Sequence, residues 1–252
     1  MNIISIVTQK GGSGKTATAA ALIAGLQREG LRVLAVDVDP QRNLTAQLGA
    51  GKGFTVLDVL TGKCTVDKAL QITPQGAIIP ASADLADKDT LAGKYGAYAI
   101  KKALEPLQYR FDVAVIDTPP NIGALTVAAM TASNGVIIPA VPDRHSIDAV
   151  RQTAASIGRI QQTTNKGLRV LGVLPTMFQK RFTVHRVQLA QLEKIAAALG
   201  LKVYSPIRYC PVVQEAEFMN QSIFDARKGN PAAVDYSELV KEVLKQITTN
   251  RP

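Results

Sequence analysis

The sequence predicts an α/β protein, a single doubly wound domain over residues 1–252, with a mostly parallel central sheet and helices on both faces. Several short runs are apolar throughout instead of alternating, which is typical of parallel strands buried on both faces. These runs alternate along the chain with longer Ala-rich or amphipathic segments, as in sheets whose strands are joined by helices. The chain has no Trp, six Tyr and six Phe, so Ala, Val, Ile and Leu must supply the core.

The elements follow from these runs in chain order. The expected strands are 3–8, 32–39, 76–81, 111–120, 135–141, 168–176 and a short one at 201–206. The expected helices are 15–28, 125–131, 146–162, 184–199 and 232–247. Pro40 forces the chain out of the second strand, and Pro119 with Pro120 ends the fourth, because proline cannot donate to a strand ladder. Residues 50–110 are the least regular, and we find no linker, internal repeat or low-complexity tract.

Composition excludes several classes of protein. Cys64 and Cys210 lack C-x-x-C spacing, so we expect no disulfide framework, zinc site or iron–sulfur site within the chain. No uninterrupted apolar run reaches the roughly 18 residues of a membrane span, and the first residues lack the basic leader of a signal peptide. The sequence therefore predicts a cytoplasmic protein.

The stretch QKGGSGKT, Gln9 to Thr16, almost matches the phosphate-binding loop G-x-x-x-x-G-K-[ST]. It follows the first strand and opens the first helix, where Gly-rich backbone turns its N–H groups toward an anion. Lys15 is expected to reach the β- and γ-phosphates, and Thr16 to place its hydroxyl on Mg²⁺. The expected nucleotide contacts in this loop are Gly11, Gly12, Ser13, Gly14, Lys15, Thr16 and Ala17. Because the loop begins so early, we expect no N-terminal helix-turn-helix.

Two features of the loop region point to more than binding. Gln9 stands where the motif has its first glycine, and a second lysine, Lys10, follows it. Carboxylates also end two of the predicted strands: Asp37 and Asp39 after the second, and Asp117 after the fourth. Because parallel strands present their carboxyl ends at one edge of a sheet, these groups are expected beside the loop. We expect Thr16, Asp39 and Asp117 to form the Mg²⁺ site.

Three motifs carry a family resemblance: KGGSGKT, DVDPQRNLT and VAVIDTPPNIG resemble the deviant Walker A, Walker A′ and Walker B motifs of the ParA/MinD ATPases. The chain is most similar to the small, Soj-like ParA partition ATPases. The resemblance includes ASADLADKD at 81–89, GVIIPAVPDRHSI at 135–147 and PIRYCPVVQEA at 206–216. Ser13 stands where Val is usual, and Arg42 where Gly is usual.

The resemblance implies a role for the second lysine, Lys10. In this family Lys10 contacts the nucleotide bound by the other subunit of an ATP-sandwiched homodimer, so Lys10, Lys15 and Asp39 are the expected catalytic residues. Asp39 is expected to position the attacking water, and Asp117 to hold the Mg²⁺ water shell. The adenine contacts that the resemblance suggests are Thr176 and the loop Pro206–Pro211, beginning with Pro206.

The net charge of +9 is concentrated in the second half of the chain. Residues 180–210 hold six Lys and Arg against Glu193 alone, which indicates a polyanionic partner. The expected DNA-binding residues are Lys180, Arg181, Arg186 and Arg208. Phosphate neutralisation needs no base recognition, so such a patch suffices for non-specific DNA binding.

These observations favour a weak ATPase for plasmid or chromosome partition. It would use ATP and Mg²⁺, dimerise, bind DNA non-specifically on the nucleoid, and be released when a ParB-like centromere-binding protein stimulates hydrolysis. One alternative is a MinD-like ATPase that cycles on membranes, which needs an amphipathic C-terminal anchor. The last helix carries Leu239, Val240 and Val243 but no Phe or Trp, so packing on the sheet explains it better. Another is a metabolic ligase or reductase on the same scaffold.

Overall fold

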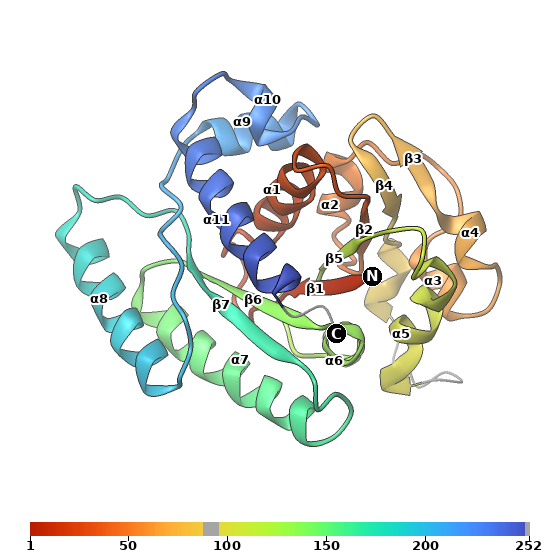
Figure 1. Cartoon of the computed structure of the whole chain (residues 1–252), viewed down its shortest axis with the longest axis horizontal. Coiled ribbons are helices and arrows are strands. Elements are labelled where there is room, and N and C mark those ends of the chain that lie inside the picture. Colours follow the sequence, from red (N-terminus) through yellow and green to blue (C-terminus); the bar gives the residue numbers. More distant parts are fainter. Residues whose placement is uncertain (88–95, 250–252) are drawn as a thin grey trace.

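The computed structural model describes residues 1–87 and 96–249, so Lys88 and Asp89 of the 81–89 motif lie outside the described residues (Figure 1). Within this part, seven strands form one sheet in the order β3-β4-β2-β5-β1-β6-β7, as predicted for a doubly wound fold. Neighbouring strands are parallel, except that β3 and β4 are antiparallel. The strands are β1 (Asn2–Ile6), β2 (Val33–Asp37), β3 (Gln71–Thr73), β4 (Gly76–Ile79), β5 (Val113–Asp117), β6 (Gly135–Ala140) and β7 (Arg169–Pro175).

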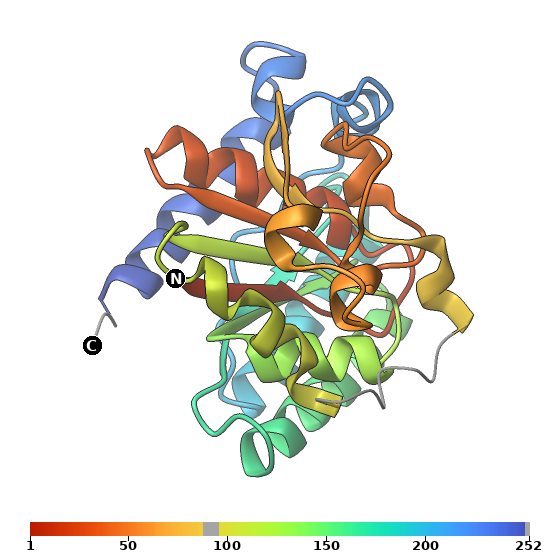
Figure 2. The same ribbon diagram turned by 90° about the vertical axis from the view of Figure 1, so that its right-hand side faces the viewer.

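Helices lie on both faces of the sheet (Figures 1 and 2). They are α1 (Lys15–Arg28), α2 (Asn43–Gln47), α3 (Val56–Leu60), α4 (Val66–Ala69), α5 (Ala99–Leu104), α6 (Ala124–Ala132), α7 (Arg144–Gln162), α8 (Thr183–Ala198), α9 (Val212–Phe218), α10 (Ile223–Ala226) and α11 (Pro231–Thr248). Each predicted helix is present, with the predicted bounds for α1 and with bounds that differ by at most two residues for the others.

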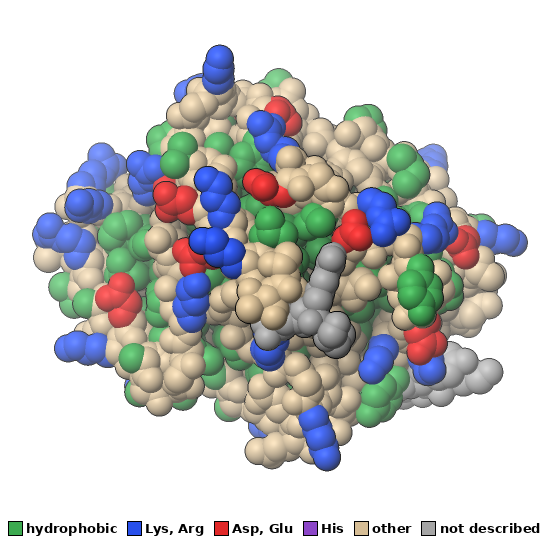
Figure 3. All heavy atoms as spheres, in the orientation of Figure 1, with side chains coloured by type: hydrophobic (Ala, Val, Ile, Leu, Met, Phe, Trp, Pro, Cys, Tyr) green, Lys and Arg blue, Asp and Glu red, His purple; other side chains and the backbone are tan. Residues whose placement is uncertain are grey.

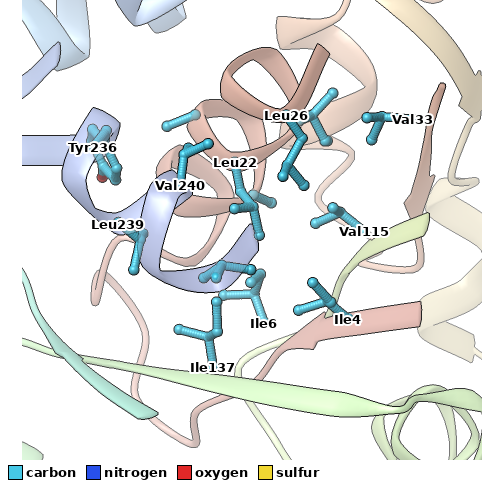
Figure 4. Packing of buried hydrophobic residues seen from close by; sticks show 14 of the residues in the cluster. Ile4, Ile6, Leu22, Leu26, Val33, Val115, Ile137, Tyr236, Leu239 and Val240 are labelled. Atoms are coloured by element: carbon cyan, nitrogen blue, oxygen red, sulfur yellow. The ribbon is translucent and has the colours of Figure 1, made fainter. Parts of the chain in front are cut away.

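The core shows why the strands read as continuous apolar runs. Successive side chains of a strand point to opposite faces, so both sets need apolar partners. Ile4 and Ile6 of β1 pack with α1 and α11 on one face, whereas Ile3 belongs to the cluster beneath α3, α5 and α6 on the other. Figure 4 shows Leu22 and Leu26 of α1 over this first face. A third cluster joins β6 and β7 to α7 and α8.

Three details differ from the sequence prediction. The strand expected at 201–206 is wrong: the segment makes only an isolated parallel bridge between Val203 and Val173 of β7. The antiparallel strand β3 was not expected, because Gln71 and Thr73 are polar and only three residues pair with β4. The short helices α2, α9 and α10, which lie outside the irregular region 50–110, were also not expected.

The last helix is packed into the fold. Leu239, Val240 and Val243 of α11 are buried, in the cluster that includes α1 and the sheet. Gly25 of α1 permits this close approach, because a Cβ there would lie 2.3 Å from Cγ2 of Val240. None of the helices in the described part of the chain contains an 18-residue stretch apolar enough to span a lipid bilayer.

Candidate functional site

The strand register brings the predicted site together at one edge of the sheet. Strand β5 lies between β2 and β1, and Asp117 at its end is paired with Asp37 of β2 and Ile6 of β1. The three strands therefore end side by side at their carboxyl ends. The Gly-rich loop follows β1, Asp37 and Asp39 lie at the end of β2, and Asp117 ends β5. Residues about a hundred positions apart in sequence, such as Thr16 and Asp117, therefore come into contact.

The Gly-rich loop needs glycine for its backbone. Gly12 and Gly14 have φ of +68° and +80°, a left-handed conformation that costs other residues roughly 1 kcal/mol or more. Gly14 is the residue before α1, and the first N–H groups of a helix have no intrahelical partner. The loop is further fixed from β7, since the Thr176 hydroxyl donates to the carbonyl of Ser13 at 2.9 Å. The result is a turn at a helix N-terminus with the backbone geometry that suits an anion.

Lys15 and Thr16 face the carboxylates. Lys15 is only 7% exposed. Burial lowers its pKa, while the charges of Asp117 and Asp39 oppose that shift. The Thr16 hydroxyl donates to Oδ2 of Asp117 at 2.7 Å. A buried ammonium in this position can donate charge-assisted hydrogen bonds to a further anionic ligand, such as a phosphate chain.

Asp117 has an incomplete set of hydrogen-bond partners. It is fully buried, and its Oδ1 has no hydrogen-bond partner among the described residues. Burial and then the neighbouring charge of Asp37 raise its pKa to about 8. A buried carboxylate oxygen without a donor fits a site completed by a cation or its bound water.

The donor set suits magnesium. The Thr16 hydroxyl, Asp117 and Asp39 offer hard oxygen ligands, which Mg²⁺ prefers. In the described ranges, no three His, Cys, Asp or Glu side chains gather closely enough to hold a metal by themselves. Mg²⁺ usually takes one or two protein ligands and completes its shell with water and phosphate oxygens, so this sparse set fits it.

Of the two aspartates after β2, one is structural. Asp37 is buried and accepts hydrogen bonds from the Asp39 N–H at 3.0 Å, the Thr45 N–H at 2.8 Å and the Thr45 hydroxyl at 2.7 Å. Burial raises its pKa to about 6 despite these donors. Asp39 is 6% exposed and accepts from the Gln41 N–H at 2.9 Å. Asp37 thus anchors the turn, and Asp39 is the carboxylate with capacity left for a ligand.

Lys10, the second lysine, binds two residues at the start of α7. Its Nζ contacts the carboxylate of Asp143 and lies 3.2 Å from the hydroxyl of Ser146. Asp143 is the N-cap of α7 and also accepts from the Ser146 N–H at 2.8 Å. Burial by itself would raise the pKa of Asp143, but the hydrogen bonds from Lys10 and Ser146 lower it overall. Asp143 lies in the 135–147 stretch that shares in the family resemblance, but sequence reasoning gave it no role.

A mostly apolar cleft adjoins the loop where a base would follow the phosphates. Its walls include Gly14, Ala17 and Thr176, which are among the expected nucleotide contacts. Of the loop 206–211, the residues 207–210 line the cleft and Pro206 does not. Sequence reasoning missed Gln214 and Tyr236, which also line the cleft. They lie on separate helices, α9 and α11, and nothing in their spacing signals a shared pocket.

The predicted DNA-binding residues fall into two groups. Lys180, Arg181 and Arg186 surround the N-terminal end of α8, and none has an ion-pair partner among the described residues. The Arg181 guanidinium lies over the Phe182 ring, 4.9 Å from its centroid. Arg208 differs, because it lines the mostly apolar cleft beside the loop. It also binds both carboxylate oxygens of Asp235, with the closest N–O distance 2.7 Å. Its charge is therefore largely matched within the chain.

Comparison with known proteins places the chain in a family. A family model described as "AAA domain" matches residues 1–170. The chromosome partitioning protein ParA of Caulobacter vibrioides is 33% identical over 258 residues, 98% of this chain and 95% of that protein. Sporulation initiation inhibitor protein Soj of Bacillus subtilis is 32% identical, over 96% of this chain and 97% of that protein.

Among solved structures, cobyrinic acid a,c-diamide synthase from Mycobacterium smegmatis, with bound ADP and magnesium, has a TM-score of 0.85. It is 33% identical and covers 100% of this chain, which covers 97% of that one. Because the AAA match spans more than half of the chain and the ParA relative aligns over nearly all of it, this chain belongs to the ParA/Soj family of P-loop ATPases.

Proposed function

We propose that this protein is a DNA-partition ATPase that dimerises around Mg-ATP, binds DNA without sequence preference and leaves it after hydrolysis. One observation carries the proposal: Lys15, Thr16, Asp39 and Asp117 gather beside the Gly-rich loop, whereas the second lysine, Lys10, binds Asp143 and none of these carboxylates. An ordinary one-subunit ATPase has no evident need for Lys10 at that place.

Each residue has a distinct part in hydrolysis. Lys15 and the loop N–H groups neutralise the phosphate chain. Bound Mg²⁺ would supply charge stabilisation on the phosphate oxygens, held through Thr16, Asp39 and Asp117. Asp39 orients a water whose oxygen attacks the γ-phosphorus, while the bond to the β–γ bridging oxygen breaks and ADP and phosphate form. Asp37 keeps the Asp39 turn in place through its three accepted hydrogen bonds.

Lys10 would act in the facing subunit. In the single chain Asp143 holds it, so its release from Asp143 is a step between binding and turnover. Across a two-fold dimer it would reach the partner's nucleotide and stabilise charge on the transferring phosphoryl group, as an arginine finger does. This makes hydrolysis depend on dimerisation, and it gives a stimulating partner, a ParB-like centromere-binding protein, a step to accelerate.

The basic end of α8 supports DNA as the polyanionic partner. Lys and Arg side chains gather at the left end of the molecule, over the tip of α8 (Figure 3). Lys180, Arg181 and Arg186 there have no acidic partner among the described residues, so their charge remains available to phosphates. Nucleoid association in the ATP state follows from such binding.

The membrane-cycling alternative needs an available apolar helix, and the structure argues against α11 in that role. Its stripe of Leu239, Val240 and Val243 already packs against α1 and the sheet. Helix α11 would have to leave the core before it could enter a bilayer, at a cost of about 25 cal/mol for each Å² of apolar surface exposed.

A metabolic ligase remains a second candidate, because the solved synthase is 33% identical over the whole chain. The two functions differ in what stimulates ATP turnover. A ligase needs an acceptor substrate, whereas a partition ATPase turns over slowly alone and faster with its partner protein and DNA.

Light scattering tests the dimer directly. With ATP and Mg²⁺ the Asp39→Ala protein, which cannot hydrolyse efficiently, is expected to double its mass, whereas with ADP or no nucleotide it stays a monomer. A single mass under all three conditions would overturn the proposed mechanism at its first step.

A further inference from the structure

Helices α7 and α8 lie side by side at the end of the molecule away from β3 and β4 (Figure 1). A groove of about 310 Å³ is lined by residues of both helices. Its apolar floor includes Ile147, which is 8% exposed, and the half-buried Ile195. The lining residues are Arg144, Ile147, Asp148 and Arg151 of α7, and Gln191, Lys194 and Ile195 of α8.

The groove carries a surplus of positive charge. Arg144 and Lys194 have no ion-pair partner among the described residues. Arg151 has a long contact of 3.8 Å with Asp148, and both side chains are more than half exposed. Such a pair is worth about 0–1 kcal/mol, so it does not prevent Arg151 from binding another anion. Three cations against one carboxylate leave the groove net positive, with an apolar floor and no internal partner for two of the cations.

The groove is continuous with the basic end of α8. Arg186 near the start of α8 and Lys194 near its end are eight residues apart, or roughly 12 Å along the helix. One strand of B-DNA presents a phosphate about every 3.4 Å of its axis, so roughly three phosphates span that distance. Arg144 and Arg151, seven residues apart on α7, repeat the pattern on the other side of the groove at about 10 Å.

We propose that Arg144, Arg151 and Lys194 extend the DNA-contacting surface from the tip of α8 across the groove onto α7. This rests on the proposed function and adds a second row of phosphate-binding cations to it. The ligand is the sugar–phosphate backbone, because the three cations are exposed side chains, and exposed Lys and Arg contact DNA phosphates without reading the base sequence.

The same end of α7 adjoins the nucleotide site. Arg144 directly follows Asp143, whose carboxylate holds Lys10. A change at Lys10 on ATP binding therefore occurs one residue from a proposed phosphate-binding side chain. This gives a short physical route by which nucleotide state and DNA binding affect each other, and such coupling is reciprocal by thermodynamic necessity.

Fluorescence anisotropy with a labelled duplex of arbitrary sequence tests the groove, in the presence of a non-hydrolysable ATP analogue and Mg²⁺. The test protein carries Arg151→Gln and Lys194→Gln. The matched control carries Arg159→Gln, two turns further along α7, where the arginine lies outside the groove. Thermal unfolding of all three proteins verifies that each remains folded.

We expect the double variant to bind DNA about tenfold more weakly at low salt, and the control to stay within twofold of wild type. The slope of log affinity against log salt should decrease by about 0.9 for every DNA phosphate that the variant no longer neutralises. A double variant with wild-type affinity and slope would overturn the groove proposal and leave the α8 surface standing. If the wild-type protein itself binds no DNA, the proposed function fails together with this extension.

Discussion

The carboxyl edge of the sheet and the α7–α8 surface both hold charge, but in opposite ways. At the sheet edge, Lys15, Asp37 and Asp117 are buried and interact with one another's charges, and Oδ1 of Asp117 has no hydrogen-bond partner among the described residues. On the α7–α8 surface, Arg181, Arg186 and Lys194 are exposed, with no acidic partner among the described residues.

This difference indicates that the sheet edge is suited to nucleotide chemistry and the α7–α8 surface to binding a charged partner. Buried, mutually constrained charges are expensive to disturb and are therefore expected to give large, specific effects on nucleotide binding and turnover. Exposed cations interact through screened Coulomb forces, so their effects should be graded, additive and sensitive to salt. Lys10 connects the two, since Asp143 holds it at the start of α7.

The largest expected effect comes from the connecting residue. Lys10→Ala should retain ADP binding, but its dimer-dependent ATP turnover should fall by about 10³-fold, the lower end for an arginine-finger residue. Steady-state phosphate release at high protein concentration measures it. A Lys10→Ala protein with normal turnover would show that the second lysine is only a partner for Asp143.

Lys15→Ala tests the buried region itself. It removes the ammonium that faces Asp117 and Asp39, so the phosphate site is left without its buried lysine. We expect nucleotide affinity to fall by at least about 100-fold, in line with 2–5 kcal/mol for truncating a buried charge partner. Isothermal titration with ADP and Mg²⁺ measures this, and affinity within fivefold of wild type would contradict the assigned role.

Asp39→Ala should separate binding from chemistry. The protein should bind ATP normally, yet hydrolyse it about 100-fold more slowly, because the group that orients the attacking water is gone. Asp37→Asn is the matched comparison: it should destabilise the turn, since Asp37 accepts three hydrogen bonds there. Equal turnover of Asp39→Ala and wild type in a single-turnover assay would remove Asp39 from the mechanism.

The buried carboxylates also predict a pH dependence. The pKa of Asp117 is raised to about 8, whereas an unfolded aspartate has a pKa of about 3.9. Between these values the folded state binds a proton that the unfolded state lacks, so stability decreases as pH rises. Without nucleotide, the free energy of unfolding should fall by about 2 kcal/mol from pH 6 to pH 8.

Urea unfolding of Asp117→Asn provides the control for that pH effect. An amide cannot ionise, so the variant should be nearly independent of pH over the same interval apart from the smaller contribution of Asp37, whose pKa is about 6. A wild-type protein that becomes more stable toward pH 8 would contradict the assignment of a protonated Asp117 in the nucleotide-free state.

The comparison also explains what the sequence could predict. The sheet and the phosphate site follow local rules: apolar runs, glycines in a phosphate loop and carboxylates at strand ends are all visible in the chain itself. The local rules failed for strand β3 and for the segment 201–206. Whether these residues form a strand depends on their pairing with β4 and β7, which the local sequence pattern does not show. Asp143 escaped because its contact with Lys10 joins residues 133 positions apart.

The basic surface was harder to predict from the sequence than the sheet and the phosphate site. A count of basic residues grouped Arg208 with Lys180, Arg181 and Arg186, but only the fold brings Asp235 against the Arg208 guanidinium. In the same way, Arg144 and Arg151 lie outside the basic stretch 180–210, and only the packing of α7 against α8 makes them neighbours of Lys194. Charge counted along a chain does not reveal which charges are already matched in space.

One measurement tests most directly whether the two regions work together: DNA affinity with ATP, with ADP and without nucleotide, over a range of salt concentrations. With ATP we expect tight binding to any sequence and a steep salt dependence, because a dimer presents two basic surfaces to one duplex and each neutralised phosphate adds about 0.9 to the log–log slope. ADP and no nucleotide should give weak binding with about half that slope. Arg181→Glu should weaken the ATP state several-fold, equally for all sequences. Identical affinities and slopes in the three nucleotide states would contradict the account, because the phosphate site would then have no influence on the DNA surface.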